Sequence, residues 1–341
     1  MRSACQTLKK AAVGGVASVA LCAPVASAHH SPAGYDLQAQ RTIEGTVTEY
    51  DWGNPHVYFS VRENGSDQVW VVEAFASTAM KSYGWSPQTF VAGDRVVVAG
   101  NPGRNPDRTI LFLRTVRKAD ADASVFDAAV ALTPVTRPAA ARVRANGLAG
   151  TWSTLVGPAF AALIPPGVFQ HTTPQGAAAI AAFNDRAGPA PECVPFSAPM
   201  YMVLPGFRSI EVRSDAVSIR GEDGGVERVV YLDVSTHAGA AQSVQGHSIG
   251  RWDDGALVVD TALFAPHLLG NGGGLPSSPG KHLTERFALN PEGGLTYSFE
   301  VEDPEYLNGR VTGTSQWVYR PDVEYAATPC SRANAERFLA E

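Results

Sequence analysis

Two adjacent histidines, His29 and His30, are the residues whose position most directly suggests chemistry. They follow Ala26-Ser27-Ala28, which supplies the small residues that are typical of a signal-peptidase site. Cleavage after Ala28 would make His29 the first residue of the mature chain, with a free α-amine beside its own imidazole. Nitrogen ligands in a planar arrangement suit Cu(II). The sequence therefore predicts a copper site at the mature N-terminus.

A further nitrogen ligand could come from His56, which follows the turn Gly53-Asn54-Pro55 and directly precedes an apolar strand. The imidazole of His30 or of His56 would complete a histidine-brace-like site with the amine and imidazole of His29. The alternative is that the cleaved terminus frays and that His56 only caps its strand. Closed tetrahedral zinc ligation is less favoured, because the remaining cysteines are expected to be paired with each other.

A second group of polar residues lies in the C-terminal half of the chain and could support acid–base chemistry, since a histidine beside a carboxylate can act as a general acid or base. His247 and Arg251 have even spacing on one expected strand, so they face the same side, and Asp260 falls on the next strand. The simpler alternative is a buried network of ion pairs and hydrogen bonds that holds the strands in register. The candidate catalytic residues are His237, His247, Asp260, His282, Glu285 and Arg286, and His267 and Asp303 belong to the same polar set.

Composition and missing motifs exclude several functions. The chain holds 27 Lys and Arg against 33 Asp and Glu, and no basic patch appears, so nucleic-acid binding is disfavoured. There is no Gly-x-Ser-x-Gly, no Rossmann or P-loop glycine pattern and no His-Glu-x-x-His. The common hydrolase, nucleotide-binding and metalloprotease functions are therefore unsupported.

The first 28 residues have the features of a removable leader. Arg2, Lys9 and Lys10 form a basic n-region, and the apolar run that follows is too short to anchor the chain in a membrane. We expect a periplasmic or secreted protein without stable membrane insertion. Removal of the leader leaves Cys193 and Cys330, and an even pair in an oxidising compartment predicts one disulfide.

The sequence of residues 29–118 predicts three strands, a short helix and two strands, which is the element order of a five-stranded OB-type barrel. Gly45 is expected to mark a bend or bulge in the first strand. Residues 119–147 lack strand alternation and are expected to be a linker, with a helical piece near Ala123 to Leu132. The expected elements of the barrel are strands at Thr42–Tyr50, His56–Val61, Gln68–Ala74, Arg95–Ala99 and Thr109–Val116 and a helix at Ser77–Tyr83.

Residues 148–341 are again β-rich, with successive short strands separated by Gly- and Asp-rich turns. Gly150-Thr151-Trp152 matches the Gly-x-Trp pattern that opens many lipocalin-type barrels. These features predict an all-β protein whose second domain is a lipocalin-like antiparallel barrel or strongly curved sheet. The Pro-rich stretch 158–199, with a helix at Gln175–Asp185, and the segment 270–280 are expected to be long loops at a mouth, where ligand sites usually lie.

Two stretches of the chain also resemble known groups. His29-His30-Ser31, Trp52-Gly53-Asn54-Pro55-His56 and Gly84-Trp85 resemble an exported bacterial domain family of unknown function. The C-terminal region is similar to another uncharacterised exported group, through Cys193-Val194-Pro195 and the stretch from Gly246 to Trp252. Because neither group has an assigned reaction, the resemblance implies export and special positions only.

We therefore expect an exported binding protein, for copper at the mature N-terminus, for a small apolar ligand in the C-terminal barrel, or for both. The alternative is a periplasmic enzyme of isomerase, lyase or hydrolase type that acts on a small hydrophobic molecule in that barrel. Convergence of His237, His247, Asp260 and Arg286 on one closed pocket would favour the enzyme, and their spread over the outer face would disfavour it.

Overall fold

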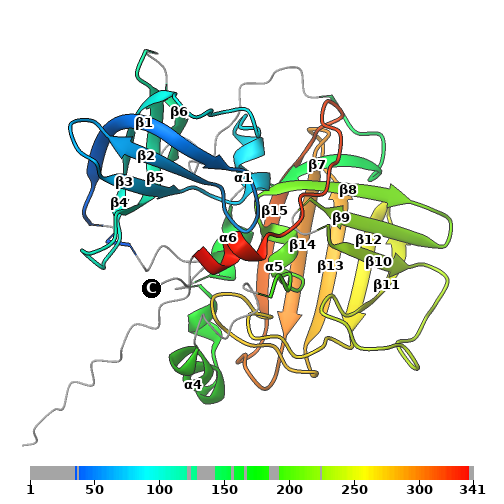
Figure 1. The fold of residues 1–341 in the computed structure, drawn as a ribbon. Coiled ribbons are helices and arrows are strands. Elements are labelled where there is room, and N and C mark those ends of the chain that lie inside the picture. Colours follow the sequence, from blue (N-terminus) through cyan, green and yellow to red (C-terminus); the bar gives the residue numbers. More distant parts are fainter. Residues whose placement is uncertain are drawn as a thin grey trace, which may run out of the picture.

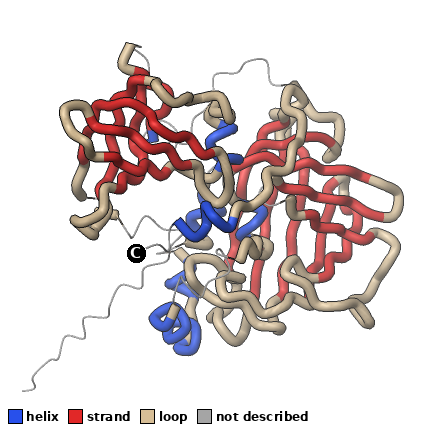
Figure 2. The backbone as a smooth tube through the Cα atoms, in the orientation of Figure 1, coloured by secondary structure: helices blue, strands red, loops and turns tan. Residues whose placement is uncertain are grey.

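The computed structural model describes residues 35–36, 38–120, 124–128, 143–154, 157–164, 167–183, 192–222 and 225–337. These residues form two β-barrels that lie next to each other, with the C-terminal segment running between them (Figure 1). Helices are short and lie around the barrels rather than within their walls (Figure 2). The prediction of an all-β protein with two barrels is confirmed.

The first barrel has the OB arrangement that the element order predicts. Strand β3 pairs with β5 in parallel, and this pairing closes the sheet order β3-β2-β1-β4-β5 into a ring. A short helix, α1 (Ser77–Ser82), connects β3 to β4. The strands are β1 (Arg41–Asp51), β2 (Tyr58–Glu63), β3 (Val69–Glu73), β4 (Arg95–Pro102) and β5 (Ile110–Lys118).

Alternation of side chains along β1 fills the core of this barrel. Ile43, Gly45 and Val47 are buried, while the residues between them face outwards or are only partly covered. A Cβ atom on Gly45 would lie 2.1 Å from the backbone oxygen of Arg62, so the glycine allows close approach of β2. The irregularity in pairing falls between Val47 and Glu49, which corrects the expected bend at Gly45.

Part of the expected linker extends the first barrel. Residues Ser124–Asp127 form β6, which pairs with β5, where a helical piece was expected. Phe126 is buried and its ring packs against those of Phe75, Tyr83 and Trp85. Burial of this aromatic side chain explains why a segment without strand alternation is recruited to the sheet.

The second barrel closes from nine strands, all antiparallel to their neighbours except one pair. Directions cannot alternate all the way around a ring with an odd number of strands, so one pair must be parallel, and here it is β10 and β11. A parallel pair needs a long crossover, which is the segment 232–246. The strands are β7 (Gly150–Thr154), β8 (Gly206–Val212), β9 (Ala216–Gly221), β10 (Glu227–Tyr231), β11 (His247–Asp253), β12 (Ala256–Ala262), β13 (His282–Leu289), β14 (Leu295–Glu302) and β15 (Val311–Tyr319).

Large side chains occupy the interior of the second barrel. Trp152, Trp317, Tyr297 and Phe287 are almost fully buried and belong to one continuous core. The indole nitrogen of Trp152 donates to the backbone oxygen of Leu148 at 2.8 Å, which keeps its polar group satisfied. Short helices surround this barrel: α3 (Pro158–Ala162), the 3-10 helix η2 (Val168–His171), α4 (Pro174–Ala182) and α5 (Met200–Val203).

After β15 the chain passes between the two barrels and ends in α6 (Arg332–Arg337), drawn in red in Figure 1. We call residues 320–337 the C-terminal strap. The predicted disulfide between Cys193 and Cys330 is present and links the strap to the loop that precedes α5. Within the described part of the chain, no helix has the length and apolar character needed to cross a membrane.

Candidate functional site

His56 lies at the end of the first barrel in a cluster with two other buried polar groups. Its Nδ1 lies 2.7 Å from Oε1 of Glu73, the last residue of β3. The hydroxyl of Tyr35 donates to the other oxygen of the same carboxylate. Burial, followed by the charge of Glu73, raises the pKa of Tyr35 well above its usual range, so the hydroxyl remains a donor.

The ring nitrogen of His56 that faces the Glu73 carboxylate is Nδ1. The contact has the distance of an ion pair, but Nδ1 forms no aligned hydrogen bond within the described part of the chain. Histidines that ligate metals almost always have a carboxylate or carbonyl group beside their other ring nitrogen. The side chain of His56 is largely buried, and its ring stacks against that of Tyr58.

Asn54 holds the turn in which His56 lies. Its side-chain oxygen accepts from the backbone nitrogen of Ser77 at 3.1 Å and from the hydroxyl of Ser77 at 2.8 Å. Its amide nitrogen donates to the backbone oxygen of Thr328 in the C-terminal strap at 3.1 Å. Asn54 is fully buried, and its two bonds to Ser77 are sheltered from water.

His29 and His30, the other two predicted copper ligands, lie outside the described residues. Tyr35 follows His30 by five positions, and its side chain is attached to the Glu73–His56 pair. A segment of this length spans at most about 20 Å. His29 and His30 are thus separated from Tyr35 by at most six positions of the chain.

The second set of predicted residues separates onto two faces of the nine-stranded barrel. His247, Asp260, His282 and Arg286 lie at positions whose neighbours along each strand point into the core. Adjacent residues of a strand face opposite sides, so these four face outwards. Arg286 lies 3.1 Å from Asp253 in an exposed ion pair.

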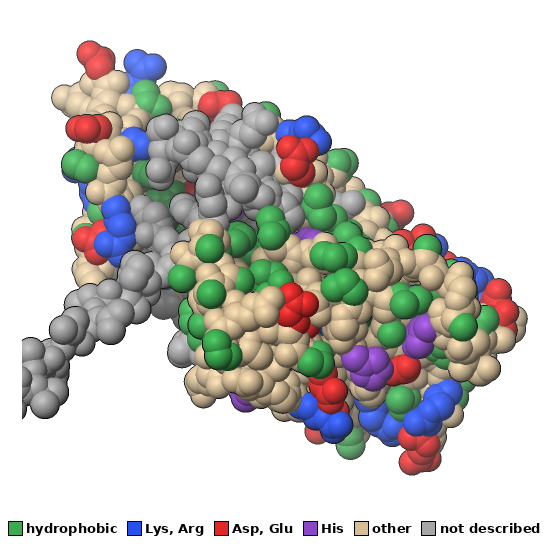
Figure 3. Space-filling model, turned by 90° about the horizontal axis from the view of Figure 1, so that it is seen from below, with side chains coloured by type: hydrophobic (Ala, Val, Ile, Leu, Met, Phe, Trp, Pro, Cys, Tyr) green, Lys and Arg blue, Asp and Glu red, His purple; other side chains and the backbone are tan. Residues whose placement is uncertain are grey.

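On the outer face, three histidines and one carboxylate form a chain of contacts. His237, carried by the crossover 232–246, has Nδ1 at 2.9 Å from Nδ1 of His247 and Nε2 at 2.9 Å from Asp260. The other oxygen of Asp260 lies 2.6 Å from Nε2 of His282. Burial, followed by the charge of His237, lowers the pKa of His247. The end-on view in Figure 3 shows histidines beside acidic side chains on the surface of the molecule.

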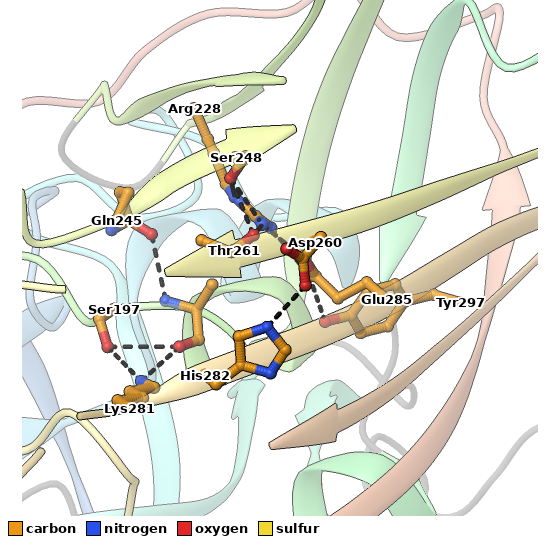
Figure 4. A network of polar contacts seen from close by, with 11 residues as sticks. Ser197, Arg228, Gln245, Ser248, Asp260, Thr261, Lys281, His282, Glu285 and Tyr297 are labelled. Carbon is orange, nitrogen blue, oxygen red and sulfur yellow. Dashed lines mark hydrogen bonds and ion pairs between the residues drawn. The ribbon is translucent and has the colours of Figure 1, made fainter. Parts of the chain in front are cut away.

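Glu285 alone of this set points into the barrel, where it meets a residue that the sequence analysis did not single out (Figure 4). Its carboxylate forms a two-pronged ion pair with the guanidinium of Arg228, with one contact at 2.8 Å. Arg228 also donates to the hydroxyls of Ser248 and Thr261, and Tyr297 donates to Glu285 at 2.8 Å. Burial alone would lower the pKa of Arg228, but the Glu285 carboxylate raises it.

The remaining residues of the set, His267 and Asp303, stabilise the loop at 270–280 together with Lys281, which the sequence did not indicate. His267 is buried and its Nδ1 accepts from the backbone nitrogen of Leu269 at 3.0 Å. Asp303 accepts from the side chain of Asn271 and from both the backbone and the hydroxyl of Ser278. Lys281 donates to the hydroxyl of Ser197 at 2.8 Å and to the backbone oxygen of Gly270 at 2.5 Å. Burial lowers the pKa of Lys281 to about 7. These bonds fix the loop against the core rather than leave it open.

Taken together, the predicted catalytic side chains do not line one closed pocket. Glu285 is engaged inside the barrel, whereas His237, His247, Asp260, His282 and Arg286 lie outside. Among the described residues, no group of three or more His, Cys, Asp or Glu side chains could hold a metal ion. A copper site that includes His56 would therefore need ligands from outside the described residues.

A shallow hollow of about 270 Å³ lies at the end of the second barrel where β7 begins. Leu148, Val212, Trp252 and Leu289 contribute its apolar lining. Trp252 is 47% exposed, which is unusual for so large an apolar side chain. The hollow lies on the surface, outside the filled interior of the barrel.

Among known protein families, a match was found for the first region of the chain only. The model of a family of unknown function, DUF6152, matches residues 16–112, consistent with the expected uncharacterised domain family. No curated protein matches the chain. One similar solved structure is the crystal structure of the ZRD-deleted mutant of TiaS in complex with agmatine. It has 18% identity over 26% of this chain and 24% of that chain, and a TM-score of 0.19, so it carries no argument here.

Proposed function

We propose that this protein is an exported Cu(II)-binding protein whose site combines the mature N-terminus with His56. The observation that supports this most strongly is the Tyr35–Glu73–His56 cluster. It places the start of the described chain next to a histidine whose Nδ1 already faces a carboxylate, the arrangement that orients metal ligands.

The ligand set follows from chemistry rather than from the fold. After cleavage behind Ala28, His29 offers an amine and an imidazole, and His30 or His56 offers a third nitrogen. Such a set of nitrogen ligands favours Cu(II) over metals that prefer oxygen. Glu73 would act on the metal only through His56, by fixing its ring orientation.

Competitive titration against a copper chelator tests the proposal. The mature protein should bind Cu(II) more tightly than a protein with one extra residue before His29, since the added residue separates the amine from the imidazole. His56→Ala should weaken binding, and His171→Ala, a matched change on η2 of the other barrel, should not. Electron paramagnetic resonance should count three nitrogens. Equal affinity of the mature and extended proteins would refute the site.

The apolar hollow around Trp252 supports a second candidate function, binding of a small apolar molecule. Exposed large aromatic side chains in a concave surface are typical of ligand contacts. Titration with 1-anilinonaphthalene should give a fluorescence change that Trp252→Ala removes. If the variant binds the probe as well as the natural protein, the hollow is not a binding site.

The enzyme alternative gains no support from the geometry. An acid–base site in the barrel would need its side chains together, and the predicted ones are divided between the core and the outer surface.

A further inference from the structure

The turn that presents His56 is attached to the second barrel through the C-terminal strap. The backbone nitrogen of Ser331 donates to the backbone oxygen of Asn54 at 2.9 Å, and Asn54 also forms a parallel bridge with Cys330. The bond from the Asn54 side chain to Thr328 adds a side-chain contact between the strap and this turn. His56 lies two residues further on.

The strap is in turn fixed to the second barrel at Glu222, directly after β9. The backbone nitrogens of Ala326 and Thr328 donate to the side chain and the backbone oxygen of Glu222, at 3.0 and 2.7 Å. The same carboxylate lies 2.6 Å from the ammonium group of Lys81 in α1 of the first barrel. Glu222 is fully buried, whereas the side chain of Lys81 remains partly exposed.

The disulfide gives the strap a second, covalent connection to the second barrel domain. Cys330 is bonded to Cys193, and the neighbouring residues Glu192 and Arg332 form an ion pair at 2.6 Å. The residue of the strap that bridges to Asn54 is therefore the one that is covalently anchored. Figure 1 shows the strap and α6 between the two barrels.

We infer that the Cys193–Cys330 disulfide positions the His56 turn, so that the proposed copper site depends on the second barrel and on thiol oxidation. Asn54 is the positioning residue through which the strap acts. Reduction would free Cys330 from its anchor and allow the strap to separate from Asn54. This regulation rests on the proposed function, but the mechanical link between disulfide and turn can be measured without metal.

The first measurement is hydrogen exchange in the absence of copper. The amide of Val57, which donates to Phe75, and that of Ser77, which donates to Asn54, report on the turn. Exchange at both should accelerate at least tenfold after reduction or in Cys193→Ser/Cys330→Ser. Asn54→Ala, which keeps the disulfide, should have the same effect at Val57; the Ser77 amide is not used in this variant, because it loses its own acceptor. Asn308→Ala, which removes a surface side-chain bond to Thr172 in the second barrel, should have none.

The second measurement is the Cu(II) affinity of the same variants. Loss of a group that orients a metal ligand typically lowers affinity about 10- to 100-fold, so reduced protein and Asn54→Ala should bind at least tenfold more weakly, with an altered paramagnetic resonance spectrum. If the natural protein binds no copper, the proposed function fails and exchange still decides the link. Unchanged exchange in Asn54→Ala, or faster exchange with unchanged affinity, would overturn the inference.

Discussion

The buried Arg228–Glu285 pair allows a sharp test of how the second barrel is stabilised. Substituting Glu285 with Ala leaves the guanidinium of Arg228 charged, 2% exposed and without its anionic partner. Removal of one member of a buried ion pair costs about 3–5 kcal/mol in the free energy of unfolding. The hydroxyl of Tyr297 loses its acceptor in the same variant, so we expect a value near the upper end of this range.

Two further variants distinguish the cost of an unpaired buried charge from the cost of removing any glutamate. Glu227→Ala, which removes one of two exposed partners of Arg220, should cost less than about 1 kcal/mol. Arg228→Met combined with Glu285→Leu removes both charges and should recover at least about 2 kcal/mol relative to Glu285→Ala, because no charge remains buried alone. The assay is urea unfolding followed by circular dichroism. A cost below about 1 kcal/mol for Glu285→Ala, or no recovery in the double variant, would refute the reasoning.

Three other predictions concern stability. Burial, followed by the charge of Lys281, lowers the pKa of His267 to about 4. The unfolded chain therefore binds this proton more readily than the folded chain does. About 3 kcal/mol of folding stability should be lost as the pH falls from about 6.5 to 4. His267→Gln should flatten that part of a pH–stability curve, and a curve of unchanged shape would contradict it. Gly45→Ala should cost about 1–3 kcal/mol in thermal unfolding, because its Cβ meets the Arg62 oxygen; a neutral effect would show that β2 moves aside. Reduction of the disulfide, which spans 137 positions, should lower stability by about 4–5 kcal/mol, and identical denaturation midpoints would exclude this contribution.

The barrels were predictable because local signals determine them. Alternating apolar residues and Gly- or Asp-containing turns mark each strand, and the order of strands and helix identifies the OB arrangement. The disulfide followed from an even number of cysteines in an exported chain. The strand β6 was missed because one buried aromatic side chain, Phe126, outweighs the absence of alternation around it.

The candidate sites depend on contacts between distant residues, which no local pattern reveals. Glu73 lies 38 positions from Tyr35, and only the closed first barrel brings both to His56. The separation of Glu285 from Arg286 was open to prediction, since adjacent strand residues face opposite sides. Arg228 could not be paired with Glu285 from the sequence, because their contact crosses the interior of the second barrel.

The odd number of strands in the second barrel has a consequence for its dynamics. The parallel junction of β10 and β11 contains only two paired positions, Val230 with Ser248 and Tyr231 with Ile249, whereas β13 and β14 are paired along eight. Local opening begins where few backbone hydrogen bonds must break. We therefore expect the barrel to open first between β10 and β11, which would convert it into an open sheet. The contacts of His237 with His247 and Asp260 attach the crossover 232–246 to β11 and β12 beside that junction.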